Sequence, residues 1–246
     1  MERLSKKLSW KAYYRLIITL LLKYGILNKK TFKIMPLPKV EPDLFFLKEI
    51  INKGAICFDV GANVGMYTSI LSSLVGPNGT IFSFEPSPLT FRLLKKIVFG
   101  RVKKLKNVNV FNMGLGSSKG HFGLIYQLDE NGNIVDPLTR IDEKGGETPI
   151  TTIDTIIEEE RISKVDFIKI DVEGYEAKVV SGAINTIQRF HPIILMEVDN
   201  NWLGRYGTSN AEIFGLLSKY GYSAYTINFG KLCKLDDCGL GNIYFM

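Results

Sequence analysis

The chain contains little cysteine and little histidine. Its 246 residues include three cysteines, Cys57, Cys233 and Cys238, and two histidines. An odd and small number of cysteines argues against a disulfide framework and indicates a reducing, cytoplasmic environment. Cys233 and Cys238 lack the histidine partners that a zinc site would need. The fold must therefore be stabilised by an ordinary hydrophobic core.

The sequence also lacks a hydrophobic run of membrane-spanning length near its N-terminus. The apolar stretch Leu16–Leu22 is too short to cross a bilayer, and Arg15 and Lys23 bracket it. No small-residue cleavage site follows it, which argues against a signal peptide. Residues 1–40 instead predict a basic amphipathic helix and a linker. Two interpretations stay open: a peripheral membrane contact, and packing over the domain or at a homodimer contact.

No strong excess of one charge is present. The net charge is +6 and the pI is about 9.0, which suits an acidic partner or a membrane surface without choosing between them. The basic stretch 101–106 carries no interleaved aromatic residues, so a nucleic-acid partner is not expected. With 46% hydrophobic and 23% charged residues, the composition is that of a globular protein with a sizeable core.

From residue 41 to residue 246 strand-like and helix-like segments alternate, which predicts one doubly wound α/β domain around a parallel sheet of about seven strands. The strands are expected at Ala55–Val60, Thr80–Glu85, Asn107–Asn112, Asp166–Ile170, Ile193–Val198, Ser223–Ile227 and Ile243–Phe245. The helices are expected at Met66–Val75, Pro88–Val98, Thr152–Glu160, Gly174–Phe190 and Ala211–Tyr220. Between them, Lys119–Pro149 interrupts the alternation and predicts an inserted β-hairpin or long loop.

The ends of the first two strands predict a nucleoside-binding site. Gly61 and Gly65 permit a tight turn and a close backbone approach to a ligand at a helix N-terminus. Glu85, at the end of the second strand, can accept two hydrogen bonds from a ribose diol. A turn with a purely structural role would explain the glycines alone, but it would not explain Glu85.

The same segment favours S-adenosylmethionine (SAM) over a dinucleotide. Asn63 stands where the dinucleotide fingerprint needs its middle glycine, and no glycine follows three places after Asn63. Asp59 suits a ligand with an ammonium group, and SAM carries an ammonium group, a ribose diol and no phosphate. An NAD-linked oxidoreductase remains as an alternative, although the chain has no obvious Tyr-x-x-x-Lys pair.

Several motifs, taken in order, resemble the FkbM-type methyltransferases. They are FDVGANVGMYT (58–68), FEPSP (84–88), TTIDTI (151–156), IKIDVEGYEAKVVSGA (168–183) and ILMEVDN (194–200). The resemblance implies a class I methyltransferase fold, SAM as methyl donor, and a hydroxyl acceptor on a sugar or a polyketide-like product. It covers the chain from about Glu41 onwards, but not the N-terminal helix or parts of the insertion.

The resemblance also implies roles for individual residues. The methionine end of SAM would be framed by Asp59, Gly61, Asn63 and Gly65. Glu85 would hold the ribose, while Met113 and Gly114 would flank the adenine. Ser87 would contact the nucleoside, although capping of the helix that follows explains it equally well.

Carboxylates at two further strand ends are the candidates for catalysis. A hydroxyl acceptor needs a general base or a metal ion, and Asp171, Glu173 and Glu197 could supply either, including a divalent cation held by Asp171 and Glu197. The helix dipole alone would also favour acidic residues at these positions. The sequence thus predicts an O-methyltransferase with a glycan or another hydroxylated small molecule as acceptor. A non-catalytic SAM-binding protein of a biosynthetic assembly is the alternative.

Overall fold

A computed structural model describes residues 43–100, 105–126, 140–228, 231–236 and 238–246. The predicted N-terminal helix within residues 1–40 therefore lies outside the described residues, as does the middle of the insertion. The chain separates into two compact units, 1–44 and 45–246, and all elements discussed below lie in the second, apart from the first residues of α3 (Asp43–Ile50). Within the described ranges, no helix is both long and apolar enough to cross a membrane.

The centre of the fold is an eight-stranded mixed sheet with the order β11-β10-β12-β9-β8-β1-β2-β3. Its parallel part comprises β1 (Ile56–Val60), β2 (Thr80–Phe84), β3 (Val108–Phe111), β8 (Phe167–Ile170) and β9 (Ile193–Val198). Its antiparallel part comprises β10 (Ala224–Asn228), β11 (Lys231–Lys234) and β12 (Gly241–Phe245). The sheet has one strand more than expected, because the chain after β10 turns back to form β11.

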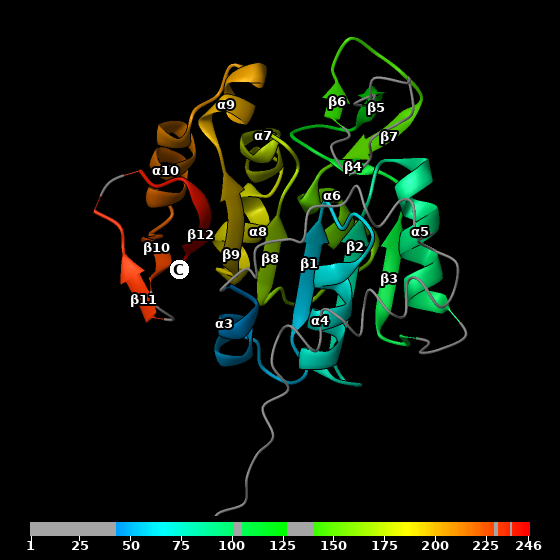
Figure 1. Ribbon diagram of the computed structural model, residues 1–246, viewed down its shortest axis with the longest axis horizontal. Helices are drawn as coiled ribbons and strands as arrows, with labels where there is room; N and C mark the ends of the chain where they lie inside the picture. The colour runs from blue at the N-terminus through cyan, green and yellow to red at the C-terminus, as the bar shows by residue number, and fades with distance from the viewer. Residues whose placement is uncertain (1–42, 101–104, 127–139, 229–230, 237) are drawn as a thin grey trace, which may run out of the picture. The chain divides into compact units, whose positions relative to one another are not determined.

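Helices cover both faces of this sheet, as Figure 1 shows, which confirms the doubly wound α/β class. They are α4 (Met66–Val75), α5 (Pro88–Phe99), α6 (Ile153–Glu159), α7 (Glu176–Ser181), α8 (Ile184–Phe190), α9 (Asn200–Leu203), the 3₁₀ turn η1 (Gly204–Tyr206) and α10 (Asn210–Ser218). The strands alternate between the faces. Phe58 and Ile168 join a buried cluster with α6, α7, α8 and α10, while Asp59 and Lys169 face α4, where they contact Thr68 and Tyr67.

The prediction of one helix over Gly174–Phe190 is wrong, because the chain forms two helices, α7 and α8, in its place. The break falls at Gly182, whose backbone packs so closely on the Gly116 carbonyl that a Cβ there would overlap it. Asp154 then caps the start of α8 by accepting hydrogen bonds from Asn185 N (3.0 Å) and Thr186 N (2.8 Å). A tertiary contact, which helical periodicity cannot reveal, therefore interrupts the helix.

The insertion, together with the residues that flank it, forms a second, four-stranded sheet with the order β4-β7-β5-β6. Its strands are β4 (Gly114–Leu115), β5 (Gly120–Ile125), β6 (Arg140–Asp142) and β7 (Thr148–Thr151). Figure 1 shows β5 and β6 beyond the upper edge of the main sheet, the edge at which β8 and β9 end. The expected hairpin-like insertion is thus confirmed, and it stands at the edge where ligands bind in sheets of this class.

A matched pair of glycine substitutions tests the break between α7 and α8. We expect Gly182→Ala to destabilise the protein by about 1–3 kcal/mol, because its Cβ would overlap the Gly116 carbonyl. Gly215→Ala is the control: Gly215 lies within α10 with open space around its Cα, so alanine should stabilise the protein by up to about 1 kcal/mol. Urea unfolding followed by circular dichroism measures both. Equal effects of the two substitutions would contradict the role given to Gly182.

Candidate active site

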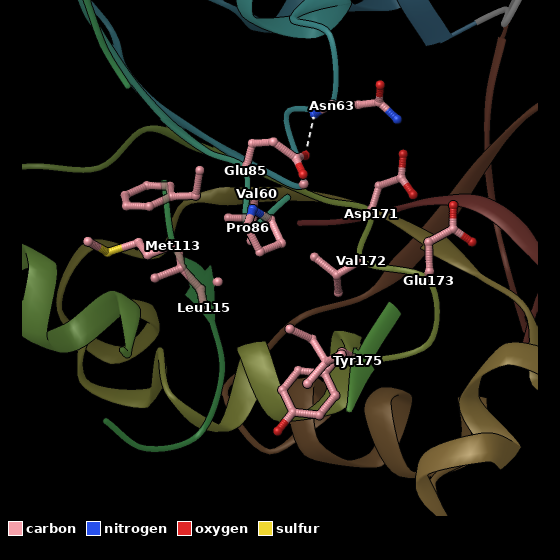
Figure 2. A pocket seen from close by; sticks show the side chains of 14 residues that line it. Val60, Asn63, Glu85, Pro86, Met113, Leu115, Asp171, Val172, Glu173 and Tyr175 are labelled. Atoms are coloured by element: carbon pink, nitrogen blue, oxygen red, sulfur yellow. Dashed lines mark hydrogen bonds between the residues drawn. The ribbon is translucent and has the colours of Figure 1, made fainter. Parts of the chain in front are cut away.

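A cleft opens where β1, β2 and β8 end, beneath the inserted sheet. Its volume is about 600 Å³, including space open to solvent. This place is that of a small-molecule site in a doubly wound fold. Figure 2 shows the side chains that line the cleft, which belong to Val60, Gly61, Asn63, Phe84, Glu85, Pro86, Met113, Gly114, Leu115, Ile141, Asp171, Val172, Glu173 and Tyr175.

The glycine turn, residues 61–65, forms one side of the cleft. Gly61 has a φ of +77°, and a Cβ at this position would overlap the backbone oxygen of Asp171. The amides of Gly61 and Ala62 both donate to Phe84 O, at 3.0 and 2.9 Å, which ties the turn to β2. Asn63 adopts a left-handed conformation with a φ of +50°, which asparagine tolerates better than most residues. The turn is therefore held from both neighbouring strands.

Glu85 is anchored on the floor of the cleft. The residue is 6% exposed, and its two carboxylate oxygens accept hydrogen bonds from Asn63 N and Ser87 N, both at 2.9 Å. Figure 2 shows the Glu85 side chain beside Asn63, with the first of these bonds dashed. Because each oxygen of a carboxylate has two lone pairs, Glu85 can accept further hydrogen bonds from a ligand. Backbone contacts thus fix the direction in which this group points.

Asp59 supports the cleft without lining it. Its side chain is fully buried, and its Oδ2 accepts a hydrogen bond of 2.6 Å from Thr68 Oγ1. The ammonium group of Lys169 lies 3.8 Å from its Oδ1. Burial raises the pKa of Asp59, while the Lys169 charge opposes that rise.

Gly65 and Ser87 also lie outside the lining of the cleft. Gly65 precedes α4 with a φ of +92°, and a Cβ there would approach the Leu94 side chain to 2.6 Å. Ser87 is fully buried and caps α5, because its Oγ accepts a hydrogen bond from Thr90 N at 3.4 Å. Capping is thus what the structure shows for Ser87, and its own amide holds Glu85.

Met113 and Gly114 line the wall opposite the acidic residues, next to Leu115 (Figure 2). This wall is apolar and continues into Ile141 of the insertion. Beside it, Asn112 secures the end of β2 by donating hydrogen bonds from its side chain to Glu85 O (2.9 Å) and Pro86 O (3.0 Å). A flat apolar group fits such a wall better than a charged one.

Asp171, Glu173 and Glu197 come together as an acidic cluster. The carboxylates of Asp171 and Glu173 project on the same side of the cleft (Figure 2), and the Glu197 side chain is hydrogen-bonded to that of Asp171. Burial, followed by the charges of Asp171 and Glu176, raises the pKa of Glu173 to about 7. Although Glu197 as a residue is exposed, protein atoms crowd its carboxyl group. This burial, the Asp171 charge and the shared hydrogen bond raise its pKa to about 8.

The predicted metal site finds no support in this geometry. Within the described ranges, no group of three or more histidine, cysteine, aspartate or glutamate side chains is arranged so that it could hold a metal ion. Glu197 also lies outside the lining of the cleft. What Asp171 and Glu197 do form is a hydrogen-bonded carboxyl pair.

Three residues of the site were missed in the sequence. Glu176 is 2% exposed, and its Oε1 accepts hydrogen bonds from Val172 N (3.0 Å) and Gly174 N (3.2 Å), which fixes the loop after β8. Burial raises the pKa of Glu176 to about 7. Lys169 places an ammonium group below the cleft, and Tyr175 lines it. The lysine gave a signal, since it interrupts an otherwise apolar strand.

Tyr175 ties the insertion to the cleft. Its hydroxyl donates a hydrogen bond of 3.0 Å to Glu143 Oε1, and its ring meets that of Tyr206 edge to face at 4.9 Å. Tyr206 in turn donates a hydrogen bond of 2.8 Å to Ile141 O. The inserted sheet is thus attached to the loop after β8 and to η1, and Ile141 reaches the cleft itself.

Known proteins with similar sequences are methyltransferases. The hexuronic acid methyltransferase AglP of Haloferax volcanii is 29% identical over 151 residues, covering 61% of this chain and 58% of that protein. The 31-O-demethyl-FK506 methyltransferase FkbM of Streptomyces tacrolimicus is 28% identical, covering 54% of this chain and 60% of that protein. The matched region is therefore about three fifths of the length of these relatives.

Among solved structures, the crystal structure of a methyltransferase FkbM from Methylobacillus flagellatus KT has a TM-score of 0.49 and 16% identity, covering 84% of this chain and 50% of that one. The family model of the methyltransferase FkbM domain matches residues 59–224, which contain the glycine turn, Glu85 and the acidic cluster. This match spans well over half of the chain, confirms the resemblance seen in the motifs and sets aside the oxidoreductase alternative. The chain belongs to the methyltransferase FkbM domain family.

Proposed function

We propose that this methyltransferase transfers the methyl group of SAM to a hydroxyl oxygen of a saccharide, with a hexuronic acid unit as the first candidate acceptor. The observation that carries the proposal is the position of the Glu85 carboxylate, held by two backbone amides beside the glycine turn. The similarity to AglP, a hexuronic acid methyltransferase, supports the saccharide class. Because the matched region is only part of the relatives' length, acceptor and activity both belong to the proposal.

The cleft residues fit SAM in three respects. Glu85 can accept hydrogen bonds from a ribose diol. The apolar wall at Met113 suits an adenine ring. Asp171 and Glu173 place negative charge at the other side, which complements a cationic ligand. When bound, SAM supplies a methyl group on a positively charged sulfur that leaves as a neutral thioether.

The acidic cluster favours a hydroxyl acceptor over a carboxylate acceptor. A hydroxyl can donate its hydrogen bond to Asp171, whereas a second carboxylate would be repelled by Asp171 and Glu173. The Asp171 carboxylate lines the cleft and shares a hydrogen bond with Glu197, so the pair can take up the hydroxyl proton. A pKa of about 8 at Glu197 gives the pair a base strength suited to neutral pH.

Binding of SAM and S-adenosylhomocysteine (SAH) tests the cofactor site. We expect wild-type protein to bind both ligands in calorimetry, with no comparable binding of NADH. Glu85→Gln should weaken binding about 10- to 100-fold, because a neutral amide replaces a charged hydrogen-bond acceptor. Glu159→Gln is the matched control, since it removes an exposed carboxylate of α6 that is paired with Lys119. This variant should bind SAM and SAH like the wild type. Equal affinities of the two variants would refute the site.

The acceptor is tested by transfer of a labelled methyl group from SAM to methyl α-glucuronide and to methyl α-glucoside. We expect label in at least one of them, resistant to mild base because an ether has formed at a hydroxyl. Base-labile label would mean a methyl ester and would overturn the hydroxyl acceptor. Binding of SAM without transfer to any saccharide of a wider panel would favour the non-catalytic SAM-binding alternative.

The coupling between Asp171 and Glu197 is measurable by titration of the carboxyl carbons in ¹³C-labelled protein. We expect the pKa of Glu197, about 8 in the wild type, to fall in Asp171→Asn, because the variant removes a negative charge beside Glu197. Asp166→Asn is the control at the opposite end of β8, where Asp166 Oδ2 accepts a hydrogen bond from Ile56 N. Asp166→Asn should leave the pKa of Glu197 unchanged. An unchanged value in Asp171→Asn would show that the two groups are not coupled.

A further inference from the structure

Lys169 is a buried charge at the centre of the parallel sheet. It lies on β8 between the apolar residues Ile168 and Ile170, and it is 5% exposed. A lysine is almost never fully buried unless it is paired, because removing its charge from water is costly. The partners of Lys169 therefore indicate why the chain keeps a charge in this strand.

The Lys169 ammonium group bridges the two sides of the cleft. It donates hydrogen bonds to Gly61 O at 3.1 Å and to Asp171 Oδ2 at 3.0 Å. Asp59 Oδ1 lies 3.8 Å away, and the ring of Tyr67 lies beneath the ammonium group at 5.0 Å. One side chain thus contacts the backbone of the glycine turn and the carboxylate that faces the acceptor side.

Lys169 also stands where negative charge accumulates. The ionisable groups that face Asp171 from the surrounding elements are Asp59 of β1, Glu173 and Glu176 of the loop and α7, and Glu197 of β9. Burial raises the pKa values of Asp59, Glu173 and Glu197, and the Lys169 charge opposes that rise. Arg205 is exposed and stacks on the Trp202 ring at 3.8 Å. Its positive charge opposes the rise in the pKa of Glu173.

We propose that Lys169 is a positioning residue of the methyltransferase, which fixes the Asp171 carboxylate against the glycine turn. The turn on the cofactor side and Asp171 on the acceptor side thereby keep a constant position relative to each other. The inference rests on the proposed function, because it assigns Asp171 to the acceptor side. A second observation supports it independently: the backbone of Asp171 approaches Gly61 so closely that no Cβ fits between them. The same two segments are thus joined once by packing and once by Lys169.

Substitution of Lys169 by methionine tests this role. In Lys169→Met we expect SAH affinity to fall about tenfold, because the Gly61 carbonyl loses its donor. The pH midpoint of SAH binding should rise by at least half a pH unit, since the carboxyl groups lose their buried cation. Lys169→Arg keeps the charge and should return the midpoint to within about 0.3 pH unit of the wild type. Calorimetry between pH 6 and pH 9 measures both quantities.

Lys164→Met is the matched control, because it removes an exposed lysine paired with Asp166 at the other end of β8. If Lys169→Met does not fold, Asp59→Asn/Lys169→Met removes the uncompensated acid as well and must still show the raised midpoint. SAH binding by Lys169→Met that matches Lys164→Met in affinity and midpoint would overturn the proposal. Failure of the wild type to bind SAH would instead refute the proposed function, so the two failures are distinguishable.

Discussion

The approach of Gly61 to the backbone of Asp171 sets the geometry on which the rest of the site depends. The two residues follow β1 and β8, which are neighbours in the sheet, and no side chain separates them. The turn after β1 is therefore fixed against the loop after β8, and Glu85 is fixed against the turn from the other side through Asn63 N. Any residue larger than glycine at this position would have to move one wall of the cleft.

The site combines a rigid floor with a charged wall. The floor is built from backbone hydrogen bonds, so its shape follows from the strand register and not from side-chain conformations. The wall carries the carboxyl groups of Asp171 and Glu173, and burial, followed by the charges of Asp171 and Glu176, raises the pKa of Glu173 to about 7. The charge of this wall therefore depends on pH near neutrality.

The inserted sheet adds a further wall to the site. Ile141 enters the cleft from β6, while Tyr175 and Tyr206 hold the insertion by hydrogen bonds and ring contacts. The doubly wound core supplies a generic place for a cofactor, and the insertion closes that place on one side. Acceptor choice is expected to depend on this region, because loops at the carboxyl edge vary while the sheet stays constant.

Local patterns in the sequence were sufficient for the class of fold, for the strands that end just before Gly61, Glu85 and Asp171, and for the family, because periodicity and motif spacing are properties of neighbouring residues. They failed where distant segments meet. The break of the long helix at Gly182 comes from the Gly116 carbonyl, and Lys169 contacts residues that follow two different strands, Gly61 and Asp171. Burial and hydrogen bonding between segments far apart in the chain decide such features, and only the tertiary structure brings those segments together.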